Sequence, residues 1–332
     1  MKQNKHANIS IFVPHIGCPH RCSFCDQRTI SGTQHAPDGI EVREICEKAL
    51  SEMKSPETAE IAFFGGSFTA VPRSYMMELL EAASLFIGEE KFRGIRISTR
   101  PDCITPEILD ILKKYGVTSI ELGAQSMSDT VLSANERGHT AEDVCKASDL
   151  IKSYGFELGL QMMVGLYKST IHDEYQTFSA IKDIHPDTVR IYPVVILKNT
   201  RLGELYQSGE YKPFDFETVL HMSSASLEKF EKLGIKVIKC GLHASEFVEK
   251  DMIGGFYHPA FRELCENVIY RRKMECKIDS DEKNCVFAVN PSCISKAAGQ
   301  RKSNILYFKE NGIEVKIIAD ENIAKYEVEL RR

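Results

Sequence analysis

The segment ISIFVPHIGCPHRCSFC, residues 9–25, joins a short apolar run to three closely spaced cysteines. The apolar run at 9–14 predicts a buried strand, because a run of this length that ends in turn residues is typical of strands. Cys18, Cys22 and Cys25 then follow with C-x3-C-x2-C spacing in a turn-rich loop. The segment therefore predicts a strand that carries a cysteine loop at its carboxyl end.

Short apolar runs alternate with longer amphipathic stretches over the first two thirds of the chain, which predicts parallel strands joined by crossover helices. Strands are expected at 9–14, 61–64, 94–99, 119–125, 157–164 and 188–195. Helices are expected at 41–53, 74–88, 105–115, 141–154, 171–183 and 216–233, and Thr105-Pro106-Glu107 is a clear helix start. No G-x-G-x-x-G follows the first strand. The pattern therefore favours an α/β fold with a partial TIM barrel of six βα units over a Rossmann sheet, although periodicity alone allows both.

The alternation changes near residue 235. A strand at 236–240, a loop rich in glycine and histidine, a helix from Ala260 and strand-like pieces at 304–308 and 314–318 are expected there. We therefore expect a barrel at 1–235, with its site at the carboxyl ends of the strands, and a small α+β accessory region at 236–332 packed on it.

Composition limits the classes of partner. A chain of 332 residues with 43% hydrophobic content can bury a barrel-sized core. Its net charge of -5 argues against binding nucleic acid through bulk charge, so an RNA substrate would need a focused site. No apolar run approaches the roughly 20 residues of a membrane span and the N-terminus is polar, which predicts a cytoplasmic protein. In that compartment the eleven cysteines are expected to be metal ligands or buried thiols.

The cysteine triplet suits an iron-sulfur cluster. Three thiolates can hold three corners of a [4Fe-4S] cubane and leave the fourth iron open to a substrate molecule. The alternative is a zinc site. Structural zinc is normally bound by four protein ligands, however, and His20 would supply the fourth only awkwardly. A chance grouping of three cysteines would leave the aromatic Phe24, directly before the last thiol, unexplained.

The triplet with Phe24 resembles the signature of radical S-adenosylmethionine (SAM) enzymes. In that family the amino and carboxylate groups of SAM chelate the open iron. One electron then cleaves the sulfonium, and the resulting 5'-deoxyadenosyl radical abstracts hydrogen from the substrate. The resemblance implies a [4Fe-4S] cluster on Cys18, Cys22 and Cys25, bound SAM, and an external electron donor such as flavodoxin or ferredoxin.

Further motifs extend the resemblance over residues 8–240. They are GGSFT at 65–69, TRPD at 99–102, ELGAQS at 121–126, NERGHT at 135–140, QMMVGL at 161–166 and RIYP at 190–193. In this order they look like the motifs of the branch that contains the Elongator catalytic subunit. They are similar, more distantly, to those of oxygen-independent coproporphyrinogen III oxidase.

The resemblance implies SAM-binding roles at the strand ends. These are Gly65 and Gly66 for the SAM ammonium, Arg137 for its carboxylate, Gln125 and Gln161 for the ribose, and Phe24, Met163 and Tyr192 near adenine or substrate. Arg100 is either a second partner for the carboxylate or part of an ordinary strand-end ion pair. Ser98 stands where the family has an acidic residue, so the contact from the third strand stays open.

The chain also departs from these patterns. It shows no glycine-rich loop before a helix near its end, so the acetyltransferase domain of the Elongator subunit is expected to be absent. Only residues 1–8 precede the first strand, where that subunit has a basic extension that contacts tRNA. Asp26 and Gln27 follow Cys25 where the coproporphyrinogen oxidase signature adds a cysteine, which disfavours that reaction.

The function expected from the sequence is therefore hydrogen abstraction by a radical SAM enzyme from an unidentified substrate, with tRNA as one candidate. The basic runs at 271–273 and 301–302 could meet RNA phosphates, although short charge runs are usually solvated surface. The alternative is a non-catalytic cluster-binding partner of a separate acetyltransferase or enzyme subunit.

Overall fold

The computed structural model describes residues 7–13, 18, 22–26, 29–30, 32, 35–243, 245–279 and 282–331. His20 and Gln27 lie outside these residues. The chain forms two compact units. Unit 1 comprises Met1–Arg190, Val194–Pro213 and Ser245–Gly255, and unit 2 comprises Ile191–Pro193, Phe214–Ala244 and Phe256–Arg332.

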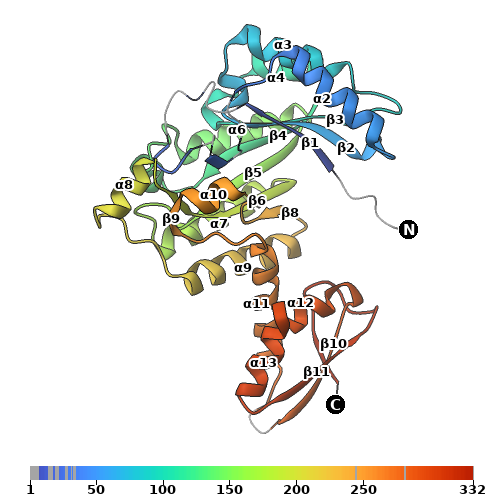
Figure 1. The fold of residues 1–332 in the computed structure, drawn as a ribbon, viewed down its shortest axis with the longest axis vertical. Helices are drawn as coiled ribbons and strands as arrows, with labels where there is room; N and C mark the ends of the chain where they lie inside the picture. The colour runs from blue at the N-terminus through green and yellow to red at the C-terminus, as the bar shows by residue number, and fades with distance from the viewer. Residues whose placement is uncertain are drawn as a thin grey trace. The chain divides into compact units, whose positions relative to one another are not determined.

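A seven-stranded parallel sheet curls into a half barrel, which confirms the predicted partial TIM barrel (Figure 1). Its strands, in order across the sheet, are β1 (Ala7–Val13), β2 (Ala59–Gly65), β3 (Gly94–Thr99), β4 (Val117–Gln125), β5 (Glu157–Val164), β6 (Thr188–Pro193) and β8 (Lys236–Cys240). All six predicted strands are present. The strand at 236–240, which we expected in the accessory region, is the seventh strand of this sheet.

Helices of unit 1 pack on the strands as crossover connections. These are α2 (Gly39–Glu52) on β1, α3 (Arg73–Ser84) on β3, α4 (Pro106–Lys114) and α6 (Ala141–Ser153) on β4, and α7 (Ile171–Ile184) on β5 (Figure 1). Local sequence sets their starts. The Thr105 side chain accepts a hydrogen bond from the Ile108 N–H and Pro106 occupies the first turn, which confirms the predicted helix start.

The strands alternate between two faces. On β2, Ile61 and Phe63 are fully buried apolar side chains, and Glu60, which precedes them, belongs to the opposite set with Ala62. The same alternation puts Arg96, Glu121 and other polar residues on one face of neighbouring strands. The half barrel therefore has an apolar face and a polar face.

Short elements complete unit 1, and the sequence did not predict them. They are α5 (Asp129–Ala134), α8 (Arg201–Gln207), α10 (Glu246–Asp251) and the antiparallel pair β7 (Val195–Leu197) and β9 (Met252–Gly255). Hydrophobic periodicity needs a window of about 11 to 18 residues, so segments this short leave no readable pattern.

Unit 2 contains α9 (Phe216–Lys232), α11 (Phe261–Glu275), α12 (Ile294–Ala298), α13 (Ser303–Glu310) and a three-stranded sheet of β11 (Glu314–Ala319), β10 (Asn284–Val289) and β12 (Glu329–Arg331). The strand-like prediction at 304–308 is wrong, because this segment lies in α13. Asn304 and Phe308, four residues apart, are both buried on one helix face. In the described part of the chain, no helix is long and apolar enough to cross a membrane.

Candidate functional site

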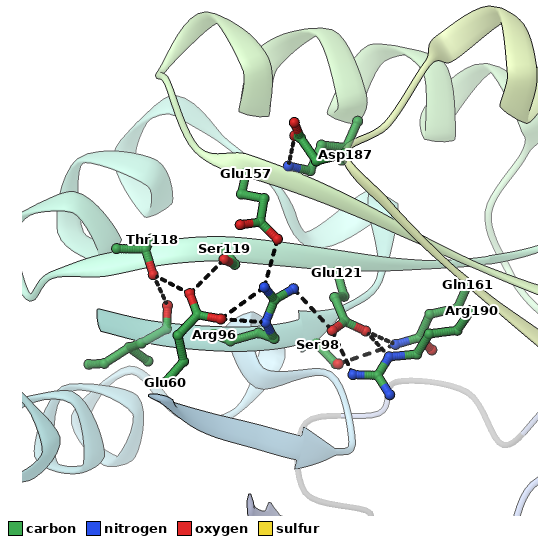
Figure 2. Close-up of polar contacts among 12 residues, drawn as sticks. Glu60, Arg96, Ser98, Thr118, Ser119, Glu121, Glu157, Gln161, Asp187 and Arg190 are labelled. Carbon is green, nitrogen blue, oxygen red and sulfur yellow. Dashed lines mark hydrogen bonds and ion pairs between the residues drawn. The ribbon is translucent and has the colours of Figure 1, made fainter. Parts of the chain in front are cut away.

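Three carboxylates and two guanidiniums form a network of ion pairs on the polar face of the sheet, on strands β2 to β6 (Figure 2). Arg96 donates to Glu60 at 2.8 Å and to Glu157 at 2.7 Å. Its remaining guanidinium nitrogen lies 3.3 Å from Glu121. Arg190 makes two hydrogen bonds to Glu121, at 2.5 and 2.8 Å. Glu121 therefore bridges two guanidiniums from strands on either side of it.

Ionisation of Glu121 follows from these partners. Burial by itself would raise the pKa of this carboxyl, but Arg190 and then Arg96 hold it below the usual range. The pKa of Glu60 is lowered in the same way: burial opposes the shift, and Arg96 with Thr118 and Ser119 overcomes it. Both carboxylates are charged at neutral pH, and each depends on its guanidinium partner.

Two residues predicted to bind SAM join this network. The Gln161 amide nitrogen donates to Glu121 at 3.0 Å and to Ser98 at 3.2 Å (Figure 2). The guanidinium of Arg190 lies 5.1 Å from the ring centroid of Phe64, within range of a cation–π interaction. The structure thus brings Ser98 and Gln161 together on the polar face of the half barrel.

The glycine pair after β2 lies against the end of β1, where the cysteine loop begins. Gly65 has φ +113°, and a Cβ there would come within 2.8 Å of the Val13 carbonyl oxygen, so only glycine fits. The Gly66 N–H donates to the same carbonyl at 2.9 Å. The next residue, Ser67, is hydrogen-bonded to Thr99 at the end of β3 at 2.8 Å. The turn therefore connects the ends of three strands.

Neighbouring loop cysteines contribute to the pKa shifts of Cys18 and Cys25. Burial raises the pKa of Cys18; a backbone hydrogen bond from Ser67 opposes this, and Cys22 adds to it. Burial also raises the pKa of Cys25, with further contributions from Cys22 and then Cys18. Among the described residues no three His, Cys, Asp or Glu side chains form a group that could hold a single metal ion. A cubane distributes its thiolates over different irons, so its ligands need not converge on one point.

Arg137 contacts the cysteine loop directly. Its guanidinium donates to the Cys22 sulfur at 2.8 Å and to the Gly123 carbonyl at 2.6 Å. The Phe24 ring lies 6.0 Å from the same guanidinium. Phe24 and Met163 also pack against an apolar cluster of unit 1 that includes Leu202. Arg137, predicted as the SAM carboxylate ligand, thus lies between a loop thiol and the end of β4.

Four buried polar atoms near the ends of β3 and β4 have no hydrogen-bond partner among the described residues. They are Arg100 Nη1, Gln125 Oε1, Arg137 Nε and His139 Nδ1. Each of these residues is at least nine-tenths buried. An unpaired buried polar group costs about 1 to 3 kcal/mol, so four of them in one region are typical of a site whose ligand supplies the partners.

The backbone and charge at this region are also unusual. Gln125 has φ +66°, an uncommon value for a residue other than glycine, and such strain clusters at functional sites. Burial, followed by the charges of Arg137 and Arg100, lowers the pKa of His139 to about 4. The imidazole is therefore neutral at pH 7 and keeps an acceptor nitrogen. Arg100 makes the strand-end ion pair considered from the sequence, with two 2.9 Å hydrogen bonds to Asp102.

Tyr192 lies on β6, in the part of the strand that belongs to unit 2. The sequence did not single out Glu121, His139, Thr99 or Asn135 as site residues, although all four fall inside the quoted motifs. Their burial is the informative property, and a single sequence does not display it. His139 in NERGHT was the strongest available signal, because a histidine two residues after a candidate ligand is a candidate itself.

Glu174 on α7 carries a testable pH effect. It accepts hydrogen bonds from the Gly165 N–H at 2.8 Å and the Ser169 hydroxyl at 2.7 Å, and burial raises its pKa to about 7. The folded state binds this proton more tightly than the unfolded state, so the stabilisation is complete below about pH 4.5 and is lost as pH rises through 7. Glu174→Gln should remove this dependence. Relative to wild type its free energy of unfolding should be unchanged near pH 5 and higher by a few kcal/mol at pH 8, as measured by urea unfolding. A difference that does not vary with pH would contradict the assignment.

Comparison with known proteins identifies the family of the chain. Residues 12–181 match the Radical SAM superfamily model, and residues 186–271 match the Radical_SAM C-terminal domain. The tRNA uridine(34) acetyltransferase of Methanocaldococcus infernus is 35% identical over 66% of this chain and 48% of its own length. Elongator complex protein 3 of Saccharomyces cerevisiae is 30% identical over 51% of this chain and 34% of its own length.

The fold has a counterpart among solved structures. The archaeal Elp3 of Methanocaldococcus infernus, with its N-terminus (1-46) deleted, superposes with a TM-score of 0.56 at 22% identity, covering 74% of this chain and 61% of that chain. This chain spans half or less of the length of the two curated relatives. The similarity to the Elongator branch is confirmed. The match over half of the sequence, on a half barrel of this kind, shows that the chain belongs to the radical SAM superfamily of enzymes.

Proposed function

We propose that Cys18, Cys22 and Cys25 hold a [4Fe-4S] cluster, and that the protein uses it with SAM to abstract hydrogen from a substrate. The family generally uses this cluster and SAM. One observation carries the proposal: the guanidiniums of Arg100 and Arg137 lie near the loop thiols, and four buried polar atoms of this region, two of them on these guanidiniums, have no partner among the described residues. When bound, the cluster supplies the electron that cleaves the SAM sulfonium and yields the hydrogen-abstracting radical.

The unpartnered atoms fit the polar groups of SAM. Arg137 Nε and Arg100 Nη1 are donors suited to its carboxylate, and Gln125 Oε1 is an acceptor suited to a ribose hydroxyl. The backbone at Gly65 and Gly66, at the end of β2, would accept from the SAM ammonium. The His139 acceptor nitrogen adds a contact that the family resemblance did not supply.

The polar face would complete the site. Gln161 uses its amide N–H groups on Glu121 and Ser98, which leaves its carbonyl oxygen as the group that meets the ribose. In this proposal Ser98 orients Gln161 and completes the SAM site from β3. Phe24, Met163 and Tyr192 would lie beside adenine or substrate.

For the substrate we propose tRNA, acted on in the cytoplasm with flavodoxin or ferredoxin as electron donor. The basis is the 35% identity to an enzyme named as a tRNA uridine(34) acetyltransferase. Since this chain spans 48% of that relative, the acetyl transfer itself is not carried over. Hydrogen abstraction is the step that the matched region can support.

The cluster and the SAM chemistry are tested on purified protein reconstituted without oxygen. We expect about four irons and matching sulfide per chain, and 5'-deoxyadenosine after addition of dithionite and SAM. A colourless protein with one zinc would contradict the cluster. A loaded protein that yields no 5'-deoxyadenosine would favour the non-catalytic alternative.

The substrate is tested separately, by nucleoside analysis of tRNA from cells that lack the gene. We expect one modified nucleoside to disappear and to return when the wild-type gene is restored. An unchanged set of tRNA nucleosides would contradict tRNA as substrate, and it would leave the SAM chemistry to the first assay.

A further inference from the structure

We infer that Asn135 is a positioning residue for the cysteine loop, which fixes the two residues between Cys22 and Cys25 in the conformation that receives the cluster. The inference rests on the proposed function. It concerns an asparagine that is neither a thiol ligand nor one of the candidate SAM contacts.

The contacts of Ser23 carry the first step. Ser23 follows Cys22 directly and is 1% exposed. Its N–H donates to the Asn135 carbonyl at 3.1 Å, and its hydroxyl donates to Asn135 Oδ1 at 2.8 Å. Its own carbonyl accepts from the Leu202 N–H at 2.7 Å. Every polar group of Ser23 is therefore held by residues more than 100 positions further along the chain.

Asn135 is itself immobilised. Its side chain is fully buried, and its amide nitrogen donates to the Val131 carbonyl at 2.8 Å and to the Tyr167 carbonyl at 2.9 Å. With Oδ1 occupied by Ser23, both ends of the amide are used. A side chain tied to α5 and to the turn after β5 cannot rotate without breaking several buried hydrogen bonds, so it is a fixed reference for the loop.

Phe24 and the cysteine backbone supply the second step. Phe24 packs against the apolar cluster that includes Tyr167 and Leu202, the same residues whose backbones hold Asn135 and Ser23. The Cys25 N–H closes a turn by donating to the Cys22 carbonyl at 3.1 Å. Ser23 and Phe24 are thus both fixed through Tyr167 and Leu202. Because the turn joins Cys22 to Cys25, it also fixes the relative position of these two cysteines.

The expected consequence concerns the cluster as well as the fold. Residues that orient metal ligands without touching the metal typically change metal affinity by about 10- to 100-fold when they are lost. Asn135→Ala leaves the Ser23 hydroxyl without its partner and frees the loop to shift. We therefore expect iron to be lost to a chelator about 10 to 100 times faster than from wild type, and the electron paramagnetic resonance spectrum of the reduced cluster to change.

The matched control is Asn304→Ala. Asn304 is also buried, and its amide also donates to two backbone carbonyls, those of Asn267 and Ala297, but it belongs to unit 2. Thr177→Val is the control within unit 1, since it removes a 2.9 Å hydrogen bond from the Met127 N–H. Thermal unfolding should show a loss of stability in all three variants. Wild-type iron retention and spectra are expected in both controls.

Ser23→Ala keeps the test decisive if Asn135→Ala does not fold. It removes only the hydroxyl contact and keeps both main-chain hydrogen bonds, so a smaller change in the same direction is expected. If the Asn135 and Ser23 variants retain iron and spectra like wild type, the positioning role is wrong and the proposed function stands. If wild type itself takes up no cluster, the proposed function fails and the inference falls with it.

Discussion

Replacing Glu121 with glutamine is expected to lower the free energy of unfolding by about 3 to 5 kcal/mol, because it leaves buried guanidiniums without their shared counter-charge. Glu121 is 1% exposed and bonds both Arg96 and Arg190. Glutamine has the same size as glutamate and leaves no cavity. The loss of stability would therefore come from the lost charge and hydrogen bonding. Removing one member of a buried ion pair is costly even where the intact pair adds little to stability.

The measurement is urea unfolding under anaerobic conditions, followed by far-ultraviolet circular dichroism. Glu142→Gln is the matched control: Glu142 pairs with Lys146 at 2.8 Å, but both side chains are about 70% exposed. Solvent screens such a pair, so the control should unfold like wild type. A Glu121→Gln protein as stable as the control would show that the network does not support the barrel.

Loss of the cluster is the second large effect, expected in Cys22→Ser. A serine hydroxyl does not replace a thiolate as an iron ligand, and the substitution also exchanges the sulfur that accepts the 2.8 Å hydrogen bond from Arg137 for an oxygen on a shorter bond. We expect the iron content to fall from about four per chain to well under one. No 5'-deoxyadenosine should form from SAM and dithionite.

The chain provides its own control for this substitution. All eleven cysteines are free, and Cys145 is exposed on α6. Cys145→Ser makes the same chemical change outside the loop, so its iron content, brown colour and 5'-deoxyadenosine yield should equal those of wild type. Equal iron in the Cys22 and Cys145 variants would exclude Cys22 as a ligand.

The sequence predicted the half barrel because its strands and helices are long and regularly patterned. Thr105-Pro106 marked a helix start correctly, since a cap depends only on neighbouring residues. Prediction failed at 304–308, where a short apolar run fits a strand and a helix equally well. There packing within unit 2 selects the helix, because a helix buries Asn304 and Phe308 together on one face.

In the candidate site, too, local patterns could be predicted and long-range contacts could not. The cysteine spacing and the Gly65-Gly66 turn are local patterns, and the sequence displays them. The contact between Arg137 and Cys22, like the one between Asn135 and Ser23, joins residues more than 100 positions apart. Such pairs become visible only when the strands are placed side by side, because no spacing rule connects them.

The hydrogen bond from Leu202 to Ser23 also has a consequence for the order of events during synthesis. A ribosome releases the cysteine loop early and Leu202 much later, and Asp251, whose side chain contacts Thr29 just beyond the loop, later still. The nascent loop therefore emerges without the partners that hold it in the finished protein. Its cysteines reach their final arrangement only after Leu202 and Asp251 have left the ribosome, so under the proposed function we expect iron and sulfide to be delivered no earlier than that point.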